Sequence, residues 1–115
     1  MAWRQRAASG RRSSDAAAGR PVTIPCALRV DGKWRHGKLT LNGELAHWRP
    51  RFGTQGSVAV DTAGTVLMDQ RDVAPAEVVS LNPGLTVLAL NAGAQRVELA
   101  ILPADLSLAG NAFGF

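Results

Sequence analysis

Residues 22–49 read VTIPCALRVDGKWRHGKLTLNGELAHWR, and this stretch decides the fold class. Apolar side chains occupy alternate positions at its start, namely Ile24, Cys26, Leu28 and Val30. This period of two residues predicts a strand with one buried face. The dipeptides Asp31-Gly32 and Asn42-Gly43 are typical of hairpin turns, because these residue types tolerate positive φ. The stretch therefore predicts three consecutive antiparallel strands, over 23–30, 33–41 and 45–49.

The rest of the chain alternates short apolar segments with turn residues. Further strands are predicted over 57–61, 65–68, 77–81, 85–90 and 95–102. Pro103 then opens a short C-terminal helix, which we expect to fray after Gly110. The sequence thus predicts an all-β fold, a small barrel or sandwich of six to seven antiparallel strands with a short C-terminal helix.

The chain divides near Pro21. Residues 1–20 hold five arginines against the single acid Asp15, with Ser, Gly and Ala between them. Such a stretch buries too little apolar area to offset the entropy of ordering it, so it is predicted to be a disordered basic tail. Residues 21–115 form the predicted single β-rich domain. Cys26, the only cysteine, is predicted to be a buried small hydrophobe, and one cysteine forms no intramolecular disulfide.

The expected compartment is the cytoplasm, with peripheral attachment to the inner membrane surface. No run approaches the ~18 consecutive apolar residues of a membrane span. The N-terminus also lacks the apolar region of a secretory signal. An unpaired thiol fits a reducing compartment.

Charge is distributed unevenly along the chain. Residues 1–52 carry eleven Arg and Lys against three acids, a net +8, whereas the remainder carries two against six, a net −4. A positive N-terminal half predicts an anionic partner on that side. The candidate anion-binding patch lies on the first three strands and their turns and comprises Arg29, Lys33, Arg35, Lys38, Arg49 and Arg51. Trp34 and Trp48 lie among these cations, either as core residues or as stacking groups.

The sequence contains few residue patterns typical of catalytic sites, so no enzyme, cofactor or metal site is predicted. His36 and His47 are the only histidines, and neither has a flanking acid at a ligand spacing. The segment Gly53-Thr54-Gln55-Gly56 lacks the Lys-Ser/Thr ending of a phosphate loop. Arg71 stands between Asp69 and Asp72, which predicts a surface turn with a local ion pair.

The order of two hairpins, a tryptophan ending the third strand, further strands and a closing helix resembles the pleckstrin-homology-like superfold. More specifically, the segments Ile24–Arg29 and Trp34–Gly37, with Leu45 and Trp48-Arg49, resemble an uncharacterised actinobacterial family of small cytoplasmic domains. The resemblance covers about residues 22–52, and its motifs are common residue types. Members of that family carry an N-terminal membrane helix, whose place is taken here by the arginine-rich tail. The resemblance implies no activity and no catalytic residues.

Three functions remain open from the sequence. The first is a non-catalytic binding or adaptor domain that meets an anionic membrane surface or a protein partner through its basic half. The alternative is a module that binds single-stranded nucleic acid, since a small β-barrel with Arg and Trp on adjacent strands suits that ligand. The third is a structural subunit, a homo-oligomer for instance, that packs through the apolar C-terminus at 106–115.

Overall fold

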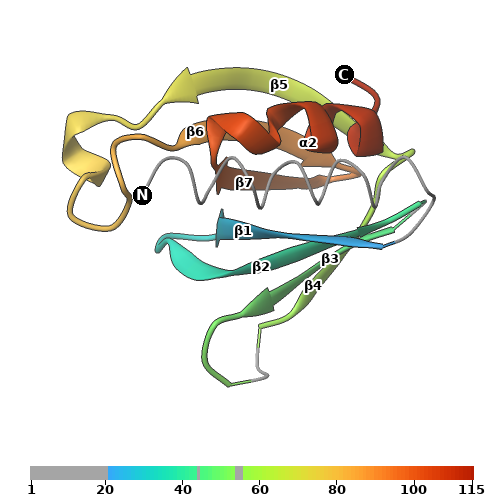
Figure 1. Ribbon diagram of the computed structural model, residues 1–115, viewed down its shortest axis with the longest axis horizontal. Coiled ribbons are helices and arrows are strands. Elements are labelled where there is room, and N and C mark those ends of the chain that lie inside the picture. The colour runs from blue at the N-terminus through green and yellow to red at the C-terminus, as the bar shows by residue number, and fades with distance from the viewer. Residues whose placement is uncertain (1–20, 44, 54–55) are drawn as a thin grey trace.

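Seven antiparallel strands form one sheet in the computed structural model, which describes residues 21–43, 45–53 and 56–115. The order in the sheet is β4-β3-β2-β1-β7-β6-β5. The strands are β1 (Val22–Arg29), β2 (Arg35–Asn42), β3 (Leu45–Pro50), β4 (Val58–Asp61), β5 (Thr65–Asp72), β6 (Thr86–Ala92) and β7 (Gln95–Ile101). The all-β class with a short C-terminal helix is confirmed, and the predicted tail at 1–20 lies outside the described residues (Figure 1).

The sheet curves around a single main core. Side chains from one face of β1, β2 and β3 meet there, including Ile24, Leu39 and Trp48, which are each 2% exposed or less. Leu88 and Ile101 join them from β6 and β7. The helix α2 (Leu106–Phe113) contacts both β2 and β5, which are far apart in the strand order, so the sheet bends around it. Figure 1 shows β1 to β4 in the lower half of the view and β5 to β7 with α2 in the upper half.

The connection between β5 and β6 folds over the opposite face of the sheet. It contains the 3-10 helix η1 (Pro75–Glu77) and contributes Leu81 to a second, smaller core with Ala27, Val87 and Ala100. The strand predicted over 77–81 is therefore wrong. The backbone N–H groups of Ser80 and Leu81 both donate to the carbonyl of Glu77, at 2.9 and 2.8 Å, so the chain winds here instead of pairing with a strand.

The C-terminal helix ends later than predicted. After the 3-10 helix η2 (Pro103–Asp105), α2 runs to Phe113 and is stopped by Gly114, whose φ is 82°. The N–H groups of Gly114 and Phe115 both donate to the carbonyl of Gly110, at 2.8 and 3.0 Å, which satisfies the helix end. Fraying after Gly110 is thus wrong. Leu108 and Phe113 pack in the core of the chain itself, so most of the apolar C-terminal surface is already covered.

β5 is also longer than its predicted range of 65–68, and a register shift between Leu67 and Asp69 interrupts its pairing with β6. Such a bulge bends an edge strand and increases its twist. Among the described helices, none has the length and apolar character needed to cross a bilayer.

Candidate functional site: a basic face and a charge cluster

The outward face of β2 and β3 carries exposed cations. Leu39 and Leu41 point into the core, so the alternation of the strand turns Lys38 to the opposite side. Lys38 lies directly opposite Arg49 of β3 in the strand register. Arg51 follows on the same side, and its backbone N–H donates to the carbonyl of His36 at 2.8 Å. We call Lys38, Arg49, Arg51, His36 and His47 the basic face.

The basic face borders a broad groove across β1, β2 and β3. Its polar lining includes Thr23, Thr40 and Asn42 besides the residues of the basic face. The described residues that line it include no Asp or Glu. Asp61 lies on β4 opposite Leu45, at the far end of the same side of the sheet. The arrangement offers cations, hydroxyl groups and an amide, which is chemistry that binds phosphate or carboxylate oxygens.

The six residues of the predicted patch do not share one surface. Lys38, Arg49 and Arg51 lie together on the basic face, whereas Lys33 lies exposed in the turn between β1 and β2. Arg35 has the parity of Leu39 in β2, so it lies on the opposite face, with its guanidinium 5.5 Å from the ring centroid of Trp48. Arg29 belongs to a separate cluster of charges.

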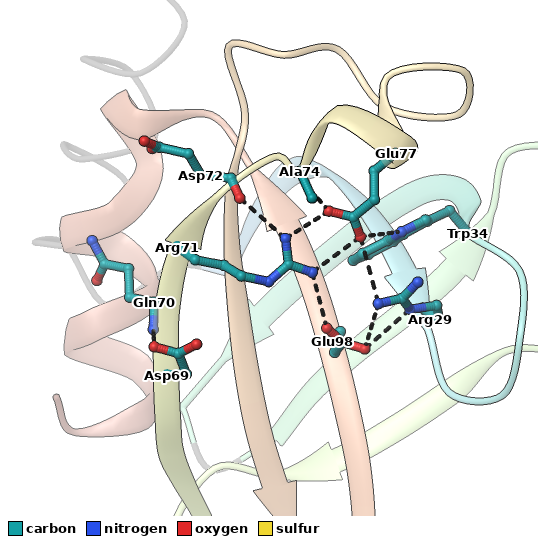
Figure 2. A network of polar contacts seen from close by, with 9 residues as sticks. All are labelled: Arg29, Trp34, Asp69, Gln70, Arg71, Asp72, Ala74, Glu77 and Glu98. Carbon is teal, nitrogen blue, oxygen red and sulfur yellow. Dashed lines mark hydrogen bonds and ion pairs between the residues drawn. The ribbon is translucent and has the colours of Figure 1, made fainter.

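That charge cluster consists of Arg29, Glu77, Arg71, Glu98 and Trp34, drawn in Figure 2. Arg29 contacts Glu98 at 2.8 Å and Glu77 at 3.5 Å. Arg71 contacts Glu77 at 2.6 Å and Glu98 at 3.4 Å. The indole N–H of Trp34 donates to Glu77 at 3.1 Å, and Arg29 stacks 4.7 Å from the Trp34 ring. Two arginines thus alternate with two carboxylates, and the four charges cancel.

The cluster ties the β5–β6 connection to the sheet. The Glu77 carboxylate also accepts the backbone N–H of Ala74 at 2.9 Å, so one side chain joins η1, β1 and β5. The hydrogen bond from Arg71 is the main cause that lowers the pKa of Glu77 from 4.5 to about 2. The same contact raises the pKa of Arg71. The predicted local ion pair of Arg71 with Asp69 or Asp72 is wrong, because Asp72 supplies only its backbone carbonyl, at 3.0 Å.

Comparisons of this chain with protein-family models, with curated proteins and with solved structures found no match.

The two tryptophans of the domain are engaged in the fold. Trp48 is 1% exposed, and its indole N–H donates to the carbonyl of Cys26 at 2.9 Å, so the core interpretation is confirmed. Trp34 is half-buried and bonded to Glu77. The burial of Cys26 is also confirmed, and removal of water from the thiolate raises its pKa, which makes it a poor nucleophile.

The two histidines lie on the same side of neighbouring strands. The Nε2–H of His36 donates to the carbonyl of Ser80 at 2.7 Å, because a carbonyl only accepts. His47 lies opposite Thr40 in the register of β2 and β3. Within the described ranges, no group of three or more His, Cys, Asp or Glu side chains is arranged to hold a metal ion. Through its hydrogen bond to Ser80, His36 joins the β5–β6 connection to the basic face.

Removing the charge of Glu77 is expected to loosen that connection. Glu77→Gln leaves Arg29 and Arg71 with one carboxylate between them, and we expect a loss of about 1–2 kcal/mol at pH 7, between the values for exposed and buried ion pairs. The folded pKa of Glu77 is depressed, so its stabilisation is present above pH 4.5 and lost as the pH falls toward about 2. The stability difference between wild type and variant should shrink over that window.

Chemical denaturation of both proteins between neutral pH and pH 2 measures this difference. Asp72→Asn is the matched control, since it removes the same charge from an exposed side chain that points away from the cluster in Figure 2. If Glu77→Gln were as stable as Asp72→Asn at pH 7, the charge of Glu77 would not be what holds the β5–β6 connection on the sheet.

Proposed function

We propose that this chain is a non-catalytic binding domain of the pleckstrin-homology-like type, which takes an anionic partner on its basic face. The observation that carries the proposal is the separation of compensated from uncompensated charge. Arg29 and Arg71 are neutralised by Glu77 and Glu98, whereas the groove beside Lys38, Arg49 and Arg51 has no acid among its described lining residues. Positive potential is thereby concentrated on one side of the sheet.

The topology supports the pleckstrin-homology-like assignment. β1 stands between β2 and β7 in the sheet, and a helix closes the core after the last strand. We propose an adaptor role on this basis, with the cytoplasm as its compartment because the unpaired thiol of Cys26 fits a reducing environment. Single-stranded nucleic acid is a weaker candidate, because it stacks successive bases on several exposed aromatic rings, and Phe52 is the one highly exposed aromatic side chain beside the basic face among the described residues. Both tryptophans that were candidates for stacking are held in contacts within the domain.

A charge reversal on the basic face tests the proposal. We expect Arg49→Glu to weaken binding to anionic vesicles by roughly 10- to 30-fold, because each basic residue near such a surface contributes ~1 kcal/mol and the reversal adds repulsion. Arg96→Glu is the matched control, since Arg96 is also exposed but lies on β7 outside the groove. Both variants retain residues 1–20, so the arginines of that segment contribute equally.

The measurement is cosedimentation of the full chain with phosphatidylserine-containing vesicles at low and high salt. Neutral phosphatidylcholine vesicles, an oligothymidine and a polyglutamate peptide are run in parallel. Binding should weaken with salt, as expected for a charge-dominated contact. Equal effects of Arg49→Glu and Arg96→Glu would refute the basic face as the site, and a wild-type chain that binds none of the anionic probes would refute the function.

A further inference from the structure

We infer that the anionic partner is a lipid bilayer, and that Phe52 and Val79 insert into it beneath the headgroups. The inference rests on the proposed function and adds the class of partner. Phe52 is 82% exposed and Val79 is 89% exposed, the two largest values among the exposed large apolar side chains of the described residues. Neither contributes to either core, so both are available to a partner.

One residue of β2, His36, forms hydrogen bonds with the chain neighbours of both side chains. His36 donates from its ring to the carbonyl of Ser80 at 2.7 Å, and its backbone carbonyl accepts the N–H of Arg51 at 2.8 Å. Val79 precedes Ser80 and Phe52 follows Arg51, so each apolar residue is next in the chain to a hydrogen-bond partner of His36. Figure 1 shows the chain after β3 at the bottom of the view and the connection after β5 at the upper left, with the β1–β2 connection between them. We call Phe52, Val78 and Val79 the apolar rim.

The segment of the β5–β6 connection that carries Val79 is anchored to the domain at both ends. Glu77 fixes its start through Arg71 and Trp34, and Leu81 fixes its end in the second core, where it is 2% exposed. Only the residues between these anchors project from the surface, with Val78 49% and Val79 89% exposed. A rigid support presents the side chains without an ordering cost on binding.

Cations border the apolar rim. Arg51 lies with its guanidinium 5.5 Å from the ring centroid of Phe52, and Arg49 and Lys38 continue along the basic face. Apolar side chains next to Arg and Lys match the boundary of a bilayer, where acyl chains lie beneath phosphates. A water-soluble polyanion would engage the cations alone. An isopropyl group has no π-face on which a base could stack, so Val79 favours lipid over nucleic acid.

Polar substitution of the apolar rim tests the inference. We expect Phe52→Ser and Val79→Ser each to weaken binding of the full chain to phosphatidylserine-containing vesicles by roughly tenfold, since each removes apolar area that the bilayer would bury. Val66→Ser is the control, because Val66 is 59% exposed on β5, outside the rim. Binding to the soluble polyanion inositol hexakisphosphate should be unchanged in all three variants. Arg49→Glu, in contrast, should weaken binding both to the vesicles and to inositol hexakisphosphate.

These outcomes separate the two proposals. Vesicle binding that is unaffected by Phe52→Ser and Val79→Ser but weakened by Arg49→Glu would overturn insertion and leave the basic face as the site. If the wild-type chain bound none of the anionic probes, both the basic face as a binding site and the insertion would be overturned. If the chain bound an oligothymidine more tightly than vesicles, and if Phe52→Ser alone weakened that binding, the partner would be nucleic acid and not a bilayer.

A fluorescent label gives a direct readout of insertion. Val79→Cys can be labelled with an environment-sensitive dye, because the natural cysteine, Cys26, is 3% exposed and its burial raises the pKa of the thiol. The emission should shift to the blue on anionic vesicles and stay unchanged with inositol hexakisphosphate. The same dye on Val66→Cys should not respond to vesicles. A blue shift at both positions, or at neither, would overturn insertion at the apolar rim.

Discussion

Trp48→Ala is expected to destabilise the domain by about 3–5 kcal/mol, the usual range for truncating a large buried aromatic side chain. The indole is 1% exposed and packs in the main core between the β1–β3 hairpins and the rest of the sheet. Its N–H also satisfies the buried carbonyl of Cys26, at 2.9 Å. Truncation removes the apolar contacts, leaves a cavity and breaks this hydrogen bond, so three losses act in the same direction.

Denaturant unfolding followed by circular dichroism measures this loss. Trp48→Phe should fall between wild type and Trp48→Ala, because phenylalanine retains much of the packing and loses only the hydrogen bond donor. Trp34 is half-buried and packs against the second core, so Trp34→Ala is the comparison there and should have the smaller effect. If Trp34→Ala were the more destabilising of the two, the second core and not the main core would dominate stability.

Gly37→Ala is expected to destabilise the domain by about 1–3 kcal/mol, or more if β2 and β3 cannot separate. A Cβ atom at this position would collide with the backbone carbonyl of Arg49 and would lie 2.7 Å from Cζ2 of Trp48. Neither neighbour can move freely, since one is the backbone of the paired strand and the other a buried ring. The glycine is required here for the close approach of the indole and β3 to the backbone of β2.

Gly64→Ala is the matched control for this substitution. Gly64 has no positive φ, and an added Cβ would meet only ordinary contacts at 3.8 Å or beyond. We expect it to leave the melting temperature nearly unchanged or to raise it slightly, because alanine restricts the unfolded chain. Equal melting temperatures for the two alanine variants would show that β2 and β3 lie farther apart at Gly37 than described above.

Local patterns predicted the first half of the sheet well. The alternation in β1 and the turn residues before β2 and β3 are properties of neighbouring residues, and they placed the first three strands within two residues of their bounds. The same kind of pattern failed at 77–81, where Val78, Val79 and Leu81 were taken for a strand. There the backbone winds through hydrogen bonds of Ser80 and Leu81 to the carbonyl of Glu77, and the contact of Glu77 with Trp34, 43 positions away, holds this turn on the sheet.

The basic patch was partly predictable. The parity of β2 is visible in the sequence, and it separates Arg35, on the side of Leu39, from Lys38 on the other side. The pairing of Arg29 with Glu98 is not visible, because it depends on β1 and β7 being neighbours although the two residues are 69 positions apart.

The amino-acid sequence by itself determined the all-β class, the three leading strands and the excess of positive charge in the N-terminal half. These properties follow from local periodicity, turn residues and composition, which need no knowledge of distant contacts. Only the tertiary structure decided which arginines are neutralised and which remain on the basic face. It alone also linked the chain neighbours of Phe52 and Val79 through His36, since both charge pairing and such links depend on which strands and connections lie side by side.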